Sequence, residues 1–221
     1  KIAVFGAGAV GSVLAAQLMH AGHEVSVIAR GDHLRAMQQK GLVYRSLTES
    51  FTVRPKVYAP SDEAGAQNVV FVTVKAHALA EIAPLIPPLL GSETVVVYVL
   101  NGIPWWYFSR KAADSPMAQH IGLHRTIGCV VQCPSRISAP GEVILDATLA
   151  RLIIGEPDNH LSARLLALLQ FSPPFEIQVS SDLRQHIWQK LCINLPGSLL
   201  TTLTQSLTAD VLASPVLRTT F

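Results

Sequence analysis

The sequence predicts an α/β protein, in which a Rossmann-type doubly wound sheet is followed by an all-helical C-terminal domain. Three observations support this class. A strand, a glycine-rich turn, a helix and a second strand follow one another within about thirty residues, the length of a βαβ unit. Apolar runs typical of strands then alternate with helical patterns, which favours a parallel sheet with helices on both faces. Near residue 180 the pattern changes to helices alone.

The composition excludes several other classes. Of the 221 residues, 49% are hydrophobic and 14% are charged, which is too apolar for a disordered or fibrous chain. There are 17 lysines and arginines against 15 aspartates and glutamates, without a basic cluster, so we expect no nucleic acid partner. The apolar runs are too short to span a membrane, and no signal peptide is visible.

The cysteines and the chain ends add two expectations. The three cysteines lack the spacing of a metal site, so we expect no metal and interpret all three as reduced core thiols of a cytoplasmic protein. Because the chain begins at Lys1 and stops at Phe221 within a helical pattern, we expect the helical domain to be truncated.

Short apolar runs place the strands of the first domain. The run at residues 2–6 is typical of a strand that is buried in a parallel sheet. The expected strands are residues 2–6, 24–29, 68–74, 95–100, 125–132, 142–146 and 151–154, and we expect antiparallel pairing for the last three.

Helical spacing of apolar residues places the helices between these strands. The first helix follows the glycine-rich turn and reaches Gly22. A second is expected over residues 78–90, with an irregular end because it contains prolines. A third is expected over residues 161–169, where Asn159 or Ser162 could cap its N-terminus.

A change of pattern near Ser180 indicates a domain boundary. Ser181-Asp182 is a helix start, and an apolar residue then recurs every four positions from Leu183 to Leu195. We therefore divide the chain into a first domain, residues 1–179, and the start of a helical substrate or catalytic domain, residues 180–221.

Residues Gly6-Ala7-Gly8-Ala9-Val10-Gly11 carry the G-x-G-x-x-G pattern of dinucleotide-binding proteins. The pattern alone is weak, since glycine is common in turns, but here it follows a strand and opens a helix. Gly6 permits the tight turn, Gly8 lets the backbone approach a pyrophosphate, and Gly11 allows close packing of helix and strand. The helix N-terminus offers N–H groups to phosphates. We therefore expect a dinucleotide cofactor at these residues.

Arg30 ends the second strand, at the position that selects between NAD and NADP. NAD enzymes usually carry an acidic residue there to bind the ribose hydroxyls, whereas this chain has Ala29-Arg30-Gly31. A guanidinium matches a 2′-phosphate in geometry and charge, although a solvated loop arginine would give the same pattern. We predict NADP as the cofactor and residues 1–179 as the NADP-binding domain.

Polar residues follow two further strands. Lys75 and Asn101 come directly after the strands expected at 68–74 and 95–100, and ligands of open α/β sheets bind beyond the carboxyl ends of the strands. An ordinary surface lysine and a simple Asn-Gly turn would explain the same residues. Trp105 and Trp106 fit a pocket wall, core packing or a contact with a partner equally well.

In the helical part, His186, Lys190, Asn194 and Ser198 are spaced by four, which would place them along one polar face. By spacing alone, such a stripe is most often a solvated face. Pro196 and Gly197 should bend or end the helix before Ser198, which leaves the alignment of Ser198 open.

The chain resembles the ketopantoate reductases (2-dehydropantoate 2-reductases) and their wider family. The resemblance implies a Rossmann domain followed by a helical domain, a site in the cleft between them, and reduction of a small 2-keto acid with NADPH on the route to pantothenate. It is carried by Gly6 to Gly11, Val74-Lys75-Ala76, Asn101-Gly102-Ile103-Pro104, Ile154-Gly155-Glu156-Pro157 and Trp188-Gln189-Lys190-Leu191-Cys192-Ile193-Asn194.

The resemblance also implies roles for single residues. It makes Lys190 the catalytic lysine, Asn101 and Lys75 the polar pair beside nicotinamide and substrate, Asn194 a substrate contact, and Arg30 the residue that meets the adenosine phosphate.

Ser198, the remaining candidate substrate contact, stands where members close to the reference enzyme carry a second asparagine. This departure leaves another small keto acid open as substrate, and a non-catalytic NADP-binding sensor is a further alternative. A homodimer is compatible with either.

Overall fold

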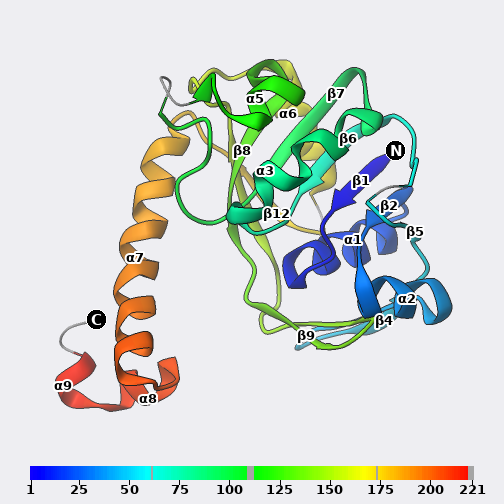
Figure 1. The fold of residues 1–221 in the computed structure, drawn as a ribbon. Helices are drawn as coiled ribbons and strands as arrows, with labels where there is room; N and C mark the ends of the chain where they lie inside the picture. Colours follow the sequence, from blue (N-terminus) through cyan, green and yellow to red (C-terminus); the bar gives the residue numbers. More distant parts are fainter. Residues whose placement is uncertain (61, 109–111, 173, 219–221) are drawn as a thin grey trace.

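The computed structural model describes residues 1–60, 62–108, 112–172 and 174–218. Its centre is an eight-stranded sheet in the order β12-β11-β8-β7-β6-β1-β2-β5 (Figure 1). Neighbouring strands run parallel, except that β8 and β11 are antiparallel. The strands are β1 (Ile2–Phe5), β2 (Val25–Ile28), β5 (Lys56–Tyr58), β6 (Gln67–Val72), β7 (Leu90–Val99), β8 (Thr126–Gln132), β11 (Arg151–Gly155) and β12 (Glu176–Val179).

The first strand shows how the sequence builds both faces of this sheet. Successive side chains of a strand point to opposite faces. Ile2 and Val4 therefore pack in one buried cluster with Leu14 of α1 (Ala9–His20), whereas Ala3 and Phe5 pack in a second cluster on the other face. The predicted α/β class, with a parallel sheet covered on two sides, is confirmed.

The segment that covers the second face is not the single helix expected over residues 78–90. It is a series of short helical turns. Leu79, Ile82 and Ile86 of these turns still pack in the buried cluster on this face of the sheet. Prolines lack the backbone N–H that continues a helix, so the irregularity expected at the end extends over the whole segment. The turns are η1 (Ala76–Ala78), α3 (Leu79–Ile82), η2 (Ala83–Leu85) and η3 (Pro87–Leu89).

A second sheet of four strands, in the order β4-β3-β10-β9, was not predicted from the sequence. The strand expected at residues 142–146 lies in this sheet and pairs antiparallel with β9, as expected, and parallel with β3. The helix α2 (Gly31–Lys40), which connects β2 to β3 along the chain, was also not predicted. The strands are β3 (Leu42–Arg45), β4 (Ser50–Val53), β9 (Ser135–Ala139) and β10 (Glu142–Leu145).

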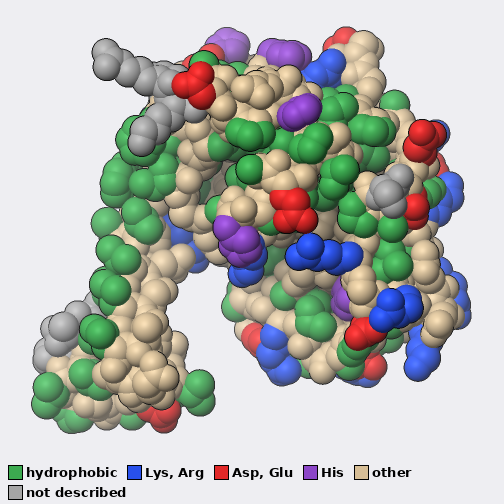
Figure 2. Space-filling model, viewed as in Figure 1, with side chains coloured by type: hydrophobic (Ala, Val, Ile, Leu, Met, Phe, Trp, Pro, Cys, Tyr) green, Lys and Arg blue, Asp and Glu red, His purple; other side chains and the backbone are tan. Residues whose placement is uncertain are grey.

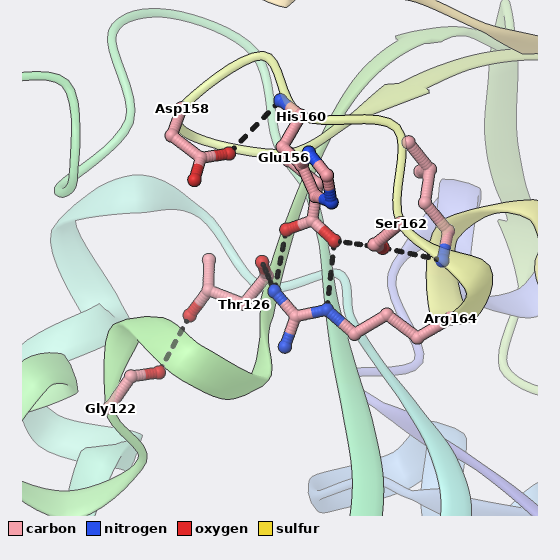
Figure 3. A network of polar contacts seen from close by, with 8 residues as sticks. Gly122, Thr126, Glu156, Asp158, His160, Ser162 and Arg164 are labelled. Atoms are coloured by element: carbon pink, nitrogen blue, oxygen red, sulfur yellow. Dashed lines mark hydrogen bonds and ion pairs between the residues drawn. The ribbon is translucent and has the colours of Figure 1, made fainter.

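The loop after β11 is tied to the sheet by a buried ion pair. Glu156 is 3% exposed and accepts hydrogen bonds from Nε and Nη2 of Arg164, at 2.8 and 2.5 Å (Figure 3). Ser162, one of the two expected caps, accepts a hydrogen bond from the N–H of Leu165 and caps α6 (Ala163–Ala167). The remaining short elements of this region are η5 (Leu168–Phe171), α5 (Pro116–His120) and η4 (Leu123–Arg125).

The C-terminal region is helical, as expected. It consists of α7 (Leu183–Thr204), α8 (Thr208–Ala213) and α9 (Pro215–Arg218), and α7 extends away from the sheet (Figure 1). Its first turns are buried at Leu183 and Ile187, whereas Leu195 on the same stripe is 51% exposed. Figure 2 shows further hydrophobic side chains along this arm.

The helix α7 does not end at Pro196, contrary to one of the two expectations for this position. It continues to Thr204, so Ser198 lies on the same helix as Asn194, four residues further along. In the described part of the chain, none of the helices is both long and apolar enough to cross a membrane.

Candidate functional site: a pocket beside the glycine turn

The turn between β1 and α1 has the backbone geometry that its glycines were expected to provide. Gly6 has a φ of +108°, in the region that favours glycine. A Cβ atom on Gly11 would lie 2.0 Å from the carbonyl oxygen of Gly6, so glycine is needed for α1 to begin this close to the strand. At Gly8, by contrast, a Cβ atom would meet nothing within 4 Å. The turn therefore presents Gly8 to open space.

The first turn of α1 offers hydrogen-bond donors at the same place. The first bond within the helix runs from the N–H of Ser12 to the carbonyl of Gly8, so the three preceding N–H groups have no partner inside the helix. Among the described residues, no side chain caps α1 at Gly8. A helix end of this kind attracts phosphate groups.

A pocket of about 660 Å³ lies beside the turn, within the size range of small-molecule sites. Six separate segments contribute to its lining. They include nearly all of the residues predicted to bind the cofactor: Gly6, Ala7, Gly8, Ala9, Val10, Arg30, Lys75 and Asn101. The exception is Gly11, which is buried behind the turn.

Arg30 lies at the edge of this pocket, directly before α2. Its side chain is 82% exposed, and its Nη1 atom is 3.9 Å from Oε1 of Glu81, another pocket residue. Ion pairs between exposed side chains contribute little energy. The guanidinium is therefore available to an anionic ligand at this edge.

Lys75 and Asn101 are exposed and follow β6 and β7, which are parallel neighbours in the sheet. The chain does not return as a hairpin strand after Asn101, because Gly102, with a φ of +88°, leads into a loop of turns. The two side chains thus lie at the carboxyl edge of the sheet, where ligands of such folds bind.

The predicted residues of the helical part do not line this pocket. Lys190 and Asn194 are half-buried and Ser198 is exposed. Because α7 is continuous, their spacing of four places them along one side of the helix. Within the described residues, no hydrogen bond or ion pair joins these three side chains to the pocket.

The base of α7 is attached to the loop that follows Asn101. Nε1 of Trp188 donates a hydrogen bond of 2.7 Å to the hydroxyl of Tyr107, and the Arg184 guanidinium lies 4.4 Å from the centre of the Tyr107 ring. Trp106 is 2% exposed and packs against Leu183, so core packing is the correct alternative for this residue. These contacts bring α7 next to the Asn101 loop.

Sequence reasoning missed a histidine in the pocket lining. His33 is half-buried, and its Nε2 atom is 3.0 Å from Oγ of Ser12, while its Nδ1 accepts a hydrogen bond from the N–H of Gly141 at 2.9 Å. Burial lowers the pKa of His33. Cys133 also lines the pocket, and burial raises the pKa of its thiol. Cys192 is exposed, so the expectation of a core thiol is wrong for this residue. The sequence offered one signal for the place of His33: it comes three residues after Arg30, which was already predicted to bind the cofactor.

Comparison with known proteins gives consistent results. Residues 2–159 match the family model described as ketopantoate reductase PanE/ApbA. The chain is 39% identical to a 2-dehydropantoate 2-reductase of Mesorhizobium japonicum over 228 residues, which cover 96% of this chain and 70% of that protein.

Two solved structures are similar over 99% of this chain. One, assigned to the ketopantoate reductases, is from Ralstonia solanacearum MolK2; it has a TM-score of 0.89, 32% identity, and 72% of its own chain covered. The other is a 2-dehydropantoate 2-reductase from Geobacter metallireducens GS-15, with a TM-score of 0.86, 29% identity and 70% of its chain covered.

Proposed function

The chain belongs to the ketopantoate reductase family, a family of oxidoreductases, and on this premise we propose that it reduces ketopantoate (2-dehydropantoate) to pantoate with NADPH, on the route to pantothenate. The observation that carries the proposal is the pocket itself. It combines an open Gly8, uncapped N–H groups of α1 and an exposed Arg30 at one edge. These features suit a pyrophosphate and a 2′-phosphate.

The proposal assigns different roles to the two parts of the chain. We propose that residues 1–179 bind NADPH and that residues 180–221 begin the part that completes the substrate site. Support comes from the attachment of α7 through Trp188 to Tyr107, on the loop that follows Asn101. The substrate would then lie between Asn101 and the side of α7 that carries Lys190.

The residues can be given chemical roles. Bound NADPH supplies a hydride to the keto carbon of the substrate. The ammonium group of Lys190 would stabilise the negative charge that develops on the keto oxygen and donate the proton. Asn101 would orient the keto oxygen, Lys75 would attract the substrate carboxylate, and Asn194 and Ser198 would contribute hydrogen bonds.

The test is NADPH oxidation with ketopantoate by the full-length protein and two lysine variants. Lys190→Ala should lower kcat by about 10²- to 10⁴-fold, as loss of a general acid usually does. Lys40→Ala is the matched control, because Lys40 is an exposed lysine at the end of α2 that does not line the pocket. A Lys190→Ala enzyme that keeps more than half of the wild-type kcat would remove Lys190 from the mechanism.

A second candidate substrate is another small 2-keto acid. Ser198 favours it, because its hydroxyl reaches less far than the asparagine side chain that resembling sequences carry there. Parallel assays with a panel of small keto acids would separate the two candidates by kcat/KM. Tight NADPH binding without turnover on any of them would instead indicate a sensor.

A further inference from the structure

A continuous hydrogen-bonded chain connects three segments at the back of the pocket. It begins at the N–H of Gly141, in the turn between β9 and β10, and passes through both ring nitrogens of His33 to Oγ of Ser12. Oγ of Ser12 in turn lies 3.2 Å from the carbonyl oxygen of Ala7, inside the glycine turn. Ser12 and Gly141 are buried, and His33 is half-buried.

The donors and acceptors of this chain allow one consistent arrangement. The N–H of Gly141 can only donate, so Nδ1 of His33 must be unprotonated. The proton of the neutral ring then lies on Nε2 and is donated to Oγ of Ser12. The Ser12 hydroxyl keeps its own proton for the carbonyl of Ala7. A second proton on His33 would set the Nδ1–H against the N–H of Gly141.

We propose that His33 is a positioning residue of the coenzyme site, which holds the glycine turn, through Ser12, in the form that accepts the dinucleotide phosphates, and does so only as the neutral imidazole. This inference rests on the proposed function, because it concerns the same pocket. It assigns His33 no contact with the reacting atoms.

The surroundings of His33 favour the neutral ring. Burial alone lowers its pKa, so the folded protein resists protonation. The side chain that faces it from α1 is the Ser12 hydroxyl. The charged groups near it along the chain are Arg30, directly before its helix, and Asp32 and Arg35 on its helix, and Glu142 of β10 is next to Gly141. Asp32 pairs with Arg35, and Glu142 pairs with Arg45. The titratable groups in the pocket wall are Cys133, Lys75, His77 and Glu81.

The pH dependence follows from the direction of this shift. If the bound form requires neutral His33, binding lowers the pKa of His33 further, and affinity is lost as pH falls through the pKa of the free protein, which lies below about 6.5. Above that range affinity should be constant. A protonated ring that contacted the phosphates directly would give the opposite result, an affinity that rises on acidification.

Two substitutions of His33 distinguish the roles of its two ring nitrogens. Gln in place of His33 can donate to Ser12 from the position of Nε2 but does not titrate, whereas Asn can accept from Gly141 but loses the donor to Ser12. At pH 8 we expect H33N to bind NADP⁺ about 3- to 10-fold more weakly than the wild type, the effect of one hydrogen bond, and H33Q to retain more affinity than H33N. In the H33N variant, the further substitution Ser12→Ala should cause no additional loss of NADP⁺ affinity, because both residues act through the same hydrogen-bonded chain.

The measurement is calorimetric titration of the full-length protein with NADP⁺ from pH 8 to pH 5.5, with unfolding temperatures to confirm that each variant is folded. Titration of the 2′-phosphate affects all variants alike, so the ratio of wild-type to H33Q affinity isolates His33, and this ratio should fall on acidification. A constant or rising ratio, or additive losses for S12A and H33N, overturns the inference while leaving NADP binding intact. No binding of NADP⁺ at pH 8 overturns the proposed function and this inference together.

Discussion

Arg30 is the residue on which the choice between NADP and NAD should depend. It stands at the end of β2 without the carboxylate that would bind ribose hydroxyls, and its Glu81 partner is distant at 3.9 Å. We predict that Arg30→Ala weakens NADPH binding by about 1.5–3 kcal/mol, the scale of a hydrogen bond to a charged group, while NADH binding changes little. Fluorescence titration with both coenzymes measures the two effects.

Glu81→Gln is the matched control for Arg30. It removes the ionic partner of the guanidinium but leaves the guanidinium in place, so NADPH affinity should stay the same or rise slightly. Equal losses for NADPH and NADH in Arg30→Ala would show that Arg30 does not distinguish the coenzymes.

The residues that sequence reasoning placed correctly in the pocket share one property. The glycine turn, Arg30, Lys75 and Asn101 each come within three residues of the end of a strand of a parallel sheet, and the carboxyl ends of such strands lie on one edge. His33 was missed because its two hydrogen-bond partners, Ser12 and Gly141, are 21 and 108 residues away along the chain. No local pattern reports a contact of that range.

At the scale of elements, the start of α1 depends on two glycines with opposite requirements. Gly11→Ala would force its Cβ to within 2.0 Å of the Gly6 carbonyl and 2.5 Å of Oγ1 of Thr73, so we predict a loss of about 1–3 kcal/mol in the free energy of unfolding. Gly8→Ala meets no atom within 4 Å and has an extended backbone. It should change stability by less than about 1 kcal/mol but weaken NADPH binding, because the methyl group enters the pocket.

Denaturant unfolding and NADPH titration of the two alanine variants provide the comparison. We expect the larger loss of stability in Gly11→Ala. We expect the clear loss of NADPH affinity in Gly8→Ala, measured on the folded protein. If Gly8→Ala binds NADPH as tightly as the wild type, the turn does not approach the pyrophosphate at this position.

The elements that the sequence did not predict are those with little local signal. The strands β3, β4 and β5 are short and partly exposed, so they lack the continuous apolar run that marks the equally short but fully buried β1 and β2. In addition, β3 pairs with β10 nearly a hundred residues later. The helix α2 buries only Met37. In both cases tertiary contacts, not local periodicity, determine the structure.

At the scale of the whole molecule, the helical arm depends on the edge of the large sheet. Gly128 of β8 and Gly155 of β11 are paired across the strands, and a Cβ atom on either would lie within 3 Å of the Leu183 side chain. The two glycines thus make room for the base of α7. Glu156, which follows Gly155, is therefore placed where the sheet, the loop and the arm meet.

The buried pair between Glu156 and Arg164 should be a major contribution to the stability of this edge. Glu156→Gln leaves the Arg164 guanidinium, whose side chain is 30% exposed, without its charge partner. Loss of one member of a buried pair typically costs 3–5 kcal/mol, and the partial exposure of Arg164 places our expectation at about 2–3 kcal/mol of unfolding free energy.

The same edge of the sheet provides the control. Arg151 of β11 and Glu176 of β12 pair at 2.8 Å with side chains 44% and 47% exposed, so Glu176→Gln should cost less than about 1 kcal/mol. Combining Glu156→Gln with Arg164→Met removes the uncompensated charge and should recover part of the loss. Urea unfolding measures the free energy of unfolding of the three variants. Equal losses for Glu156→Gln and Glu176→Gln would show that burial does not make the Glu156 pair more stabilising than the exposed pair.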